Sequence, residues 1–200
     1  MREVAIYEPS QSISVFEKFP HKILFTNSKE NGFWGVKNNA CKQVSFETSN
    51  SYVGQDHLHV KWDASKCNYI GIGLKWNNYK VKNLEPIIEL AAIELRVRID
   101  SGALSNIPMF FILEDYGGKQ CRANINYLDL EGGKIDTQWR RIRIPLQAFN
   151  YEKHGVKMKN IKELRLEFQR KGHLHIDNIV IVPHDYNYKN TTNKFTKVFN

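Results

Sequence analysis

Apolar and polar residues alternate with a period of two in several separate segments of this chain. The alternation runs through HLHVKW (57–62), IELRVRID (93–100) and ELRLEFQ (163–169), and it opens HLHIDNIVIV (173–182). Successive side chains of a β-strand point to opposite faces of a sheet, so this pattern is typical of strands with one buried and one solvated face. The chain must therefore bury one face of each of these strands in a core.

Other segments have the composition of strands and are separated by turn residues. The further predicted strands are VAIY (4–7), KILFTN (22–27), QVSFET (43–48), YIGIGLKW (69–76), PMFFILED (108–115), CRANINYL (121–128) and WRRIRIPL (139–146). Glycines at positions 32, 117–118, 132–133 and 172 mark turns between them. No ten-residue helical period stands out, although residues 83–92 could form one helical turn with Pro86 at its start.

About ten strands without helical crossovers predict an all-β protein, an antiparallel β-sandwich of jelly-roll type. The sequence contains no internal repeat and no linker rich in Pro, Gly or Ser. We therefore expect one domain over residues 1–183, followed by a polar, Asn-rich tail over residues 184–200.

Composition excludes several classes of protein. A hydrophobic content of 42%, with 12% aromatic residues, excludes wholesale disorder. No segment approaches the roughly 18 to 20 apolar residues of a membrane-spanning helix, and residues 1–9 carry no secretory signal. The three cysteines allow at most one disulfide and match neither a zinc site nor a disulfide framework.

The net charge of +8 comes entirely from the last third of the chain. Residues 139–200 contain 13 Lys and Arg against 5 Asp and Glu, whereas residues 1–138 contain 16 of each. A basic half is compatible with nucleic acid or with an anionic polymer. No nucleic-acid-binding motif accompanies it, so we do not expect nucleic acid as a partner.

The order of several motifs resembles one known family. Two motifs come first, SYVGQDHLHVKW (51–62) and YIGIGLKWNNYKVKNL (69–84). Two long predicted strands follow, AIELRVRIDSG (92–102) and IPMFFILEDYGGK (107–119). The last three segments are WRRIRIPLQAF (139–149), KNIKELRLEF (159–168) and GHLHIDNIVIV (172–182). Together these segments resemble carbohydrate-binding modules with the galactose-binding-like jelly-roll fold, over residues 22–183. The resemblance implies a non-catalytic module that binds a poly- or oligosaccharide, as an accessory domain of a polysaccharide-degrading system. It also implies a secreted or cell-surface location.

The resemblance further implies a structural Ca²⁺ that ties the first strand to the last. Asp177 occupies the place of the last-strand ligand, and Asn27 falls where an acidic first-strand ligand is expected, with Glu8 and Glu17 as other candidates. Calcium prefers six to eight oxygen ligands. The alternative is that Asp177 hydrogen-bonds a neighbouring loop.

A sugar site needs flat aromatic rings together with paired hydrogen-bonding groups. We expect the ligand-binding residues to come from loop aromatics and from the polar faces of two strands: Trp34, Trp76, Tyr79, Glu94, Arg96, Arg98, Arg165 and Glu167. If the two strands are neighbours, their charges form one cluster, and its arginines favour acidic sugars such as uronates. Tyr116 is a further loop aromatic, whereas Trp62 and Trp139 are expected in the core. The plainer interpretation of the charges is a ladder of surface salt bridges.

Two other functions remain open. One is a structural or protein-interaction sandwich with no sugar site, in which Trp34, Trp76 and Tyr79 would all be buried. The other is a jelly-roll metalloenzyme, because HxH pairs at 57–59 and 173–175 could bring imidazoles together if their strands are adjacent. No nucleophile, phosphate-binding or dinucleotide motif is present. We therefore predict no catalytic residues.

Overall fold

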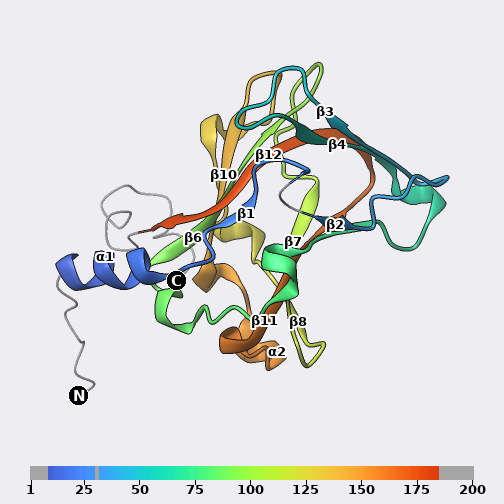
Figure 1. Ribbon diagram of the computed structural model, residues 1–200. Helices are drawn as coiled ribbons and strands as arrows, with labels where there is room; N and C mark the ends of the chain where they lie inside the picture. Colours follow the sequence, from blue (N-terminus) through green and yellow to red (C-terminus); the bar gives the residue numbers. More distant parts are fainter. Residues whose placement is uncertain (1–8, 30–31, 185–200) are drawn as a thin grey trace, which may run out of the picture.

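The computed structural model describes residues 9–29 and 32–184, which form two antiparallel sheets packed face to face (Figure 1). The seven-stranded sheet has the order β3 (Lys42–Glu47), β4 (His57–Asp63), β12 (Lys171–Pro183), β6 (Ala91–Arg98), β10 (Arg140–Pro145), β9 (Asp129–Leu130), with β1 (Ile23–Phe25) also paired to β12. The five-stranded sheet has the order β2 (Phe33–Trp34), β5 (Gly71–Leu74), β11 (Ile161–Phe168), β7 (Met109–Asp115), β8 (Gln120–Arg122). The expected antiparallel sandwich of jelly-roll type is confirmed.

Most of the predicted strands are present. Strands β2 and β9 were not predicted, since two residues are too few to show an alternation. The segment 121–128 is only partly a strand, because the chain leaves β8 at Arg122 and makes a 3-10 turn at Ile125–Tyr127. The strand expected at residues 4–7 and the tail from residue 185 onward lie outside the described residues.

Helical structure is limited to short segments. Helix α1 (Pro9–Lys18) was not predicted, and α2 is a single turn at Tyr151–His154. The 3-10 turn at Glu85–Ile87 begins with Pro86 in its first turn, as expected. The remaining 3-10 turns are Ala64–Lys66, Trp76–Tyr79, Glu131–Gly133, Leu146–Ala148 and Met158–Asn160. No helix of the described residues is both long and apolar enough to cross a membrane.

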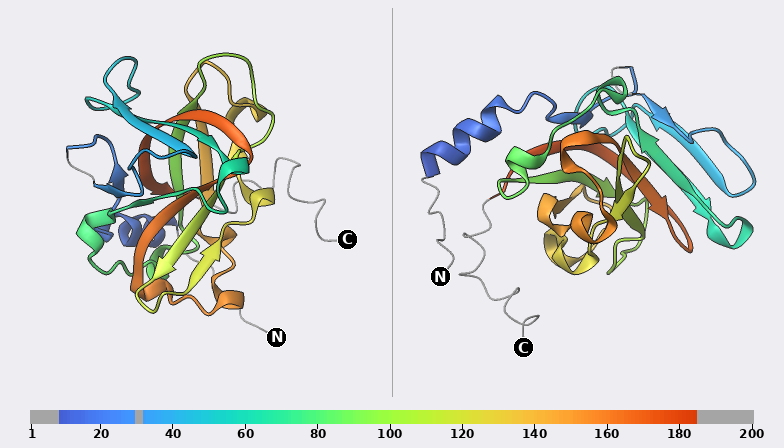
Figure 2. Two further views of the ribbon diagram at one scale, coloured as in Figure 1. Left: turned by 90° about the vertical axis from the view of Figure 1, so that its right-hand side faces the viewer. Right: turned by 90° about the horizontal axis from the view of Figure 1, so that it is seen from below.

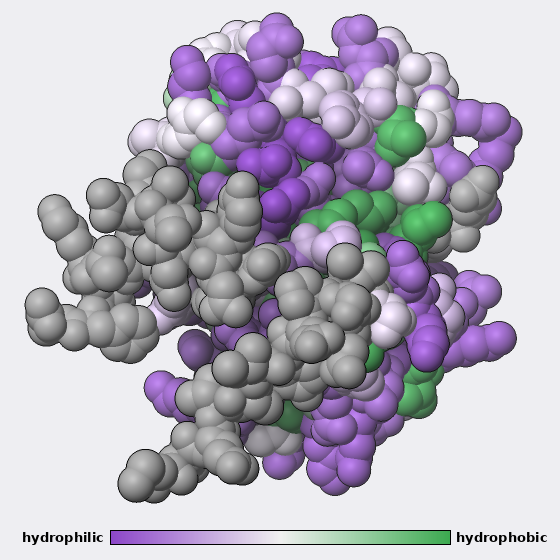
Figure 3. Space-filling model, turned by 90° about the vertical axis from the view of Figure 1, so that its left-hand side faces the viewer, coloured by the Kyte–Doolittle hydropathy of each residue, from purple (hydrophilic) through white to green (hydrophobic). Residues whose placement is uncertain are grey.

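The core lies between the two sheets and is built from the apolar phase of each alternating strand. Leu58 and Val60 of β4 and Leu164 and Leu166 of β11 are completely buried. Trp62 packs against Phe168 with 4.7 Å between ring centroids, so its expected core position is confirmed. Figure 2 shows helix α1 at one side of the sandwich. The surface drawn in Figure 3 is mainly hydrophilic, with small hydrophobic patches. The apolar residues are thus concentrated inside the sandwich.

Strand β12 changes phase halfway along its length. Leu174 and Ile176 face the core before the change, and Ile179 and Ile181 face it afterwards. The register shift against β6 lies between Asp177 and Val180, where Asn178 has a φ of 48°. The bulge lets one strand of thirteen residues keep apolar side chains on the core across its curved path (Figure 1).

One disulfide joins Cys41 to Cys67, and Cys121 is free and buried. The bond ties the start of β3, at the edge of the seven-stranded sheet, to the connection between β4 and β5. Burial raises the pKa of the Cys121 thiol to about 12, which makes this cysteine an apolar core residue at neutral pH.

Removing the disulfide lowers stability. The bond closes a loop with a sequence separation of 26 residues, and cross-links of this length contribute about 3 kcal/mol by restricting the unfolded chain. The double variant Cys41→Ser/Cys67→Ser should therefore lose about that much free energy of unfolding in guanidinium denaturation, and the wild type should lose as much in reductant. A Cys121→Ala variant is the control: it retains the disulfide, so its free energy of unfolding should still be lower under reducing than under oxidising conditions. Equal stability of the wild type with and without reductant would contradict this assignment.

Candidate functional site

The charged residues expected to form one cluster lie on two different sheets. Arg96 and its neighbours are on β6 of the seven-stranded sheet, whereas Arg165 and Glu167 are on β11 of the five-stranded sheet. In a sandwich, the polar phases of the two sheets point away from each other. The supposition that these strands are neighbours was therefore wrong, and each outer face has to be considered separately.

The outer face of the seven-stranded sheet carries a dense network of arginines and carboxylates. Arg143 donates to Oε2 of Glu94 at 2.6 Å, and Arg96 lies 3.4 Å from both Glu94 and Glu131. Arg141 stands opposite Arg96 in the register of β10 and β6. Because Glu94 is only 7% exposed, this network holds its charges close to the protein interior.

Two aromatic rings stand on this face and each is paired with an arginine. The guanidinium of Arg98 lies 5.3 Å from the ring of Trp139, and that of Arg96 lies 4.6 Å from the ring of Tyr52. The two rings are 6.3 Å apart, and Trp139 Nε1 donates to the carbonyl of Asn50. Trp139 is half-buried and Tyr52 is 44% exposed. The core position expected for Trp139 was wrong, because β10 begins only at Arg140 and Trp139 precedes it on the polar face.

Unpaired polar atoms are concentrated on the same face. Within the described part of the chain, four buried side-chain nitrogens have no hydrogen-bond partner: Nε of Arg96, Arg98 and Arg141, and Nε2 of His59. All four belong to the outer face of the seven-stranded sheet. A buried polar atom without a partner costs about 1–3 kcal/mol, so the polar groups of this face are incompletely satisfied by the protein itself.

The outer face of the five-stranded sheet also has an aromatic ring, but its polar groups are paired. Trp34 donates to Glu163 at 2.7 Å and lies under Arg165, 5.1 Å from the ring centroid. Arg165 is bonded to Glu163 and Glu114, and both oxygens of Glu167 accept from Arg122. Tyr79 is half-buried beneath Lys162 on this side. The charged residues among these predicted site residues are thus paired with one another or with neighbouring side chains on this face.

Trp76 was predicted as a stacking platform, and its position rules out that role. Its side chain is 1% exposed, and Nε1 donates to the carbonyl of His21 at 3.1 Å. Lys82, which is fully buried, lies 5.0 Å from the ring, and burial lowers the pKa of this lysine to about 8. A sugar ring cannot reach a tryptophan that is packed in this way.

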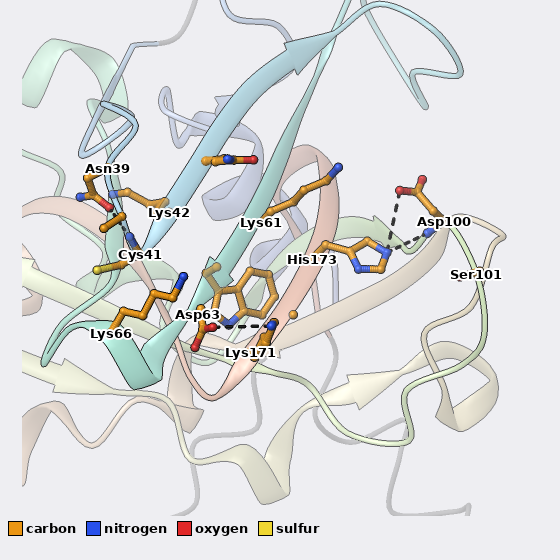
Figure 4. A pocket seen from close by; sticks show the side chains of 14 residues that line it. Asn39, Cys41, Lys42, Lys61, Asp63, Lys66, Asp100, Ser101, Lys171 and His173 are labelled. Atoms are coloured by element: carbon orange, nitrogen blue, oxygen red, sulfur yellow. Dashed lines mark hydrogen bonds and ion pairs between the residues drawn. The ribbon is translucent and has the colours of Figure 1, made fainter.

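A hollow of about 670 Å³ opens at one end of the outer face of the seven-stranded sheet (Figure 4). Lys61, Lys66 and Lys171 line it together with Asp63 and Asp100. A second hollow of about 470 Å³ adjoins it along β3 and β4 and shares Asn39, Gln43 and Lys61 with the first. The lysines outnumber the aspartates, so this end of the face is cationic.

The histidines of both HxH pairs meet on this face because β4 and β12 are adjacent, with His59 directly opposite His175. His57 Nε2 lies 2.8 Å from His175 Nδ1, and His175 Nε2 lies 2.8 Å from Asp100. Burial, and then the charge of His59, lowers the pKa of His175 to about 4, although the bond to Asp100 acts in the opposite direction. Burial and the charge of Arg98 also lower the pKa of His57. Both rings are therefore neutral at pH 7.

The predicted calcium ligands have partners of a different kind. Asp177 is fully buried, and its carboxylate accepts hydrogen bonds from the backbone N–H groups of Tyr52, Val53 and Asn178. Burial raises the pKa of Asp177 against these bonds. The amide oxygen of Asn27 accepts from Lys29 N–H at 3.1 Å. A carboxylate surrounded by N–H donors does not fit a calcium ligand set, which consists of oxygens; the calcium site stays a prediction.

The fold and the site together define a class: a jelly-roll sandwich with aromatic rings on a polar sheet face. A family model for carbohydrate binding domain 30 matches residues 22–183. The chain belongs to this family of non-catalytic carbohydrate-binding modules. No curated protein matches the chain.

Solved structures show the same fold at low sequence identity. A crystal structure of a family 30 carbohydrate-binding module is 14% identical, with a TM-score of 0.58, over 84% of this chain and 86% of that one. The family 30 module of a cellulosomal cellulase of Clostridium thermocellum is 15% identical, with a TM-score of 0.53, over 82% of this chain and 94% of that one. A family 11 module of C. thermocellum, in complex with a β-1,3-1,4-mixed-linked tetrasaccharide, is 14% identical, with a TM-score of 0.52, over 82% of this chain and 96% of that one.

One structural neighbour is a longer chain. An exo-β-agarase is 11% identical, with a TM-score of 0.52, over 82% of this chain but only 25% of its own. The present chain thus corresponds to about a quarter of the length of that protein. At this identity the likeness concerns the fold alone.

The two aromatic residues that distinguish this face, Tyr52 and Trp139, are not among the site residues predicted from the sequence. Tyr52 was included only within a strand motif, and Trp139 was assigned to the core. The available signal for Trp139 was its place just before WRRIRIPL, where the alternation puts it in phase with Arg141 and Arg143 rather than with Ile142.

The role of Asp177 can be tested without reference to ligand. Asp177→Asn should lower the free energy of unfolding by about 1–3 kcal/mol, because the side chain loses an ionised acceptor for the 52–53 loop. Chemical denaturation should give the same loss in EDTA and in calcium. A loss that occurs only in calcium would instead establish the predicted metal site.

Stability should fall as the pH drops below 6.5. The folded-state pKa of His175, about 4, lies below its unfolded value of 6.5, so the unfolded chain binds more protons between these values. The stabilisation is complete above pH 6.5 and is lost progressively towards pH 4, with a slope of up to about 1.4 kcal/mol per pH unit. The measurement is the free energy of unfolding of the wild type and of His175→Gln, determined in EDTA by chemical denaturation between pH 4 and pH 7. The wild type should lose stability more steeply as the pH falls, and equal slopes of stability against pH in the two proteins would contradict this expectation.

Proposed function

We propose that this module binds polysaccharide on the outer face of the seven-stranded sheet, with Trp139 and Tyr52 as the stacking platforms. The observation that carries the proposal is the coincidence of two partly exposed aromatic rings with arginines whose hydrogen bonds are incompletely satisfied. Arg96 and Arg98 each lie against one of the rings, and each has a buried Nε without a partner, so a reorientation of the guanidinium group would offer a donor to a ligand. Sugar hydroxyls accept such hydrogen bonds while the apolar side of a pyranose ring stacks on an aromatic face.

The opposite face is the alternative, and it is less well suited. Trp34 provides a ring there, but its indole N–H is bonded to Glu163, and Arg165 is held by two carboxylates. A ligand on that face would have to break existing salt bridges to form its own bonds. Of the residues predicted from the sequence, Glu94, Arg96 and Arg98 belong to the proposed binding face. Trp34, Tyr79, Arg165 and Glu167 lie outside it.

Binding without hydrolysis is the activity that this face supports. Glycoside hydrolysis uses two carboxyl groups in a cleft, one of which must donate a proton. The two oxygens of Glu94 accept from Arg96 and Arg143, and Glu131 accepts from the Arg141 backbone N–H and from Arg96. These carboxylates position arginines and have no free proton to donate. We propose an accessory role, in which the module holds a neighbouring catalytic domain near its polymer.

The ligand class follows from the two parts of the face. The aromatic part suits an uncharged glucan such as the mixed-linked oligosaccharide named in the family 11 complex. The adjoining hollow with Lys61, Lys66 and Lys171 favours carboxylates, so uronate-containing polymers are the second class to compare. Retention in affinity gels that contain mixed-linkage β-glucan or polygalacturonate separates the two.

Truncating either ring should weaken retention. Trp139→Ala and Tyr52→Ala should each reduce affinity for the bound polymer about 30-fold, since loss of an aromatic anchor at the centre of an interface costs about 2 kcal/mol. Isothermal titration with a soluble oligosaccharide gives the magnitude. Trp34→Ala is the matched control on the opposite face and should change affinity less than twofold. Loss of binding in Trp34→Ala with unchanged binding in Trp139→Ala would overturn the proposal.

A further inference from the structure

Three potential metal ligands converge beside the proposed sugar-binding face, and His57 lies next to two of them. One ligand atom each from Glu47, His59 and His175 lies within 4.8 Å of the others. Glu47 Oε1 is 2.5 Å from His59 Nδ1, and Glu47 Oε2 is 3.9 Å from both His175 Nδ1 and His57 Nε2. Tetrahedral donors around Zn²⁺, each about 2.0–2.1 Å from the ion, are about 3.3 Å apart. The observed separations bracket this value.

The protons of this cluster leave suitable lone pairs. A carboxylate only accepts, so the bond between His175 Nε2 and Asp100 places the proton on Nε2 and leaves Nδ1 to accept from His57 Nε2–H at 2.8 Å. Moving the His57 proton to Nδ1, which faces Ser51, frees both of these lone pairs for a metal ion. In His59, Nδ1 faces Glu47, and Nε2 is buried without a partner among the described residues. Moving the His59 proton to Nε2 therefore breaks no bond except the one to Glu47, and it frees Nδ1 as a ligand.

The surroundings support a cation. Asp100 orients His175 through its second nitrogen, which is the usual arrangement around a metal-bound histidine. Ser51 lies 3.4 Å from His57 Nδ1 and can orient that ring in the same way. Arg98 Nη2 lies 3.5 Å from His175 Nδ1, the proposed ligand atom, and its positive charge opposes a cation there. The carboxylates of Glu47 and Asp100, which lie beside the same ring, outnumber that single charge. The hollow lined by Glu47, His59 and Lys61 provides an entry path from solvent.

We propose that Glu47, His59 and His175, with His57 as the fourth ligand, form a binding site for Zn²⁺ or a similar borderline transition metal. Imidazole and carboxylate donors at four positions match the preference of this ion. The ligands come from three neighbouring strands, β3, β4 and β12, and three of them are buried. The site is separate from Asp177 and from the calcium prediction.

Metal titration of the full chain tests the site. Protein stripped with EDTA and dialysed should bind one equivalent of Zn²⁺ in isothermal titration, and Co²⁺ in its place should give the intense visible bands of four-coordinate cobalt. Glu47→Gln should weaken Zn²⁺ binding by more than the roughly 10- to 100-fold that loss of an outer-shell partner costs. Asp100→Asn should weaken it by about tenfold. Glu47 is partly exposed, so its replacement leaves the fold intact even if variants of the buried histidines unfold.

His173→Gln is the matched control, because this histidine is on the same strand and outside the ligand set. It should change Zn²⁺ affinity less than threefold. Absence of Zn²⁺ binding and of cobalt bands at equimolar metal would overturn the proposal. Binding that is unchanged in Glu47→Gln and lost in His173→Gln would also overturn it. None of these measurements involves a sugar, so the metal site and the sugar-binding proposal stand or fall separately.

Discussion

The pairing of β12 with three other strands holds the seven-stranded sheet together. β12 lies between β4 and β6 and also pairs with β1. Its apolar residues close the core on one side, and its polar residues His173, His175 and Asp177 form the middle of the outer face. The bulge after Asp177 allows both, because it resets the side-chain phase without ending the strand. Asp177 in turn anchors the loop that carries Tyr52.

The outer face of this sheet brings more charge close to the interior than solvation alone requires. Buried charges are costly unless they are paired, and each member of a pair needs its remaining bonds satisfied. Glu94 and Arg143 meet this requirement, whereas Arg96, Arg98 and Arg141 each retain an unpaired Nε. On the opposite outer face, Arg122 is paired with Glu167, and Arg165 with Glu163 and Glu114, so the side chains of that face satisfy one another. This contrast between two faces of one sandwich distinguishes the binding face better than the presence of a tryptophan, since both faces have one.

The alternation of side chains was enough to predict most strands and the sandwich, because burial of one face is a local property. Which strands are neighbours is not local. Arg96 and Arg165 have the same pattern in the sequence but lie on opposite outer faces, since β6 pairs with β10 and β12 while β11 pairs with β5 and β7. Trp76 and Tyr79 follow a strand in the sequence, but Trp76 is buried by the chain around His21. Conversely, the two HxH pairs converge because β4 and β12 are adjacent, which the sequence left open.

The central claim concerns which face binds sugar, and the four tryptophans provide a direct test. Their indole N–H groups have different acceptors: Glu163 for Trp34, Gln169 for Trp62, His21 for Trp76 and Asn50 for Trp139. Titration of a ¹⁵N-labelled sample with a soluble oligosaccharide reports on all four at once. The account predicts that the Trp139 indole resonance shifts in proportion to saturation while those of Trp34, Trp62 and Trp76 stay in place. A shift of the Trp34 resonance with an unchanged Trp139 resonance would contradict it.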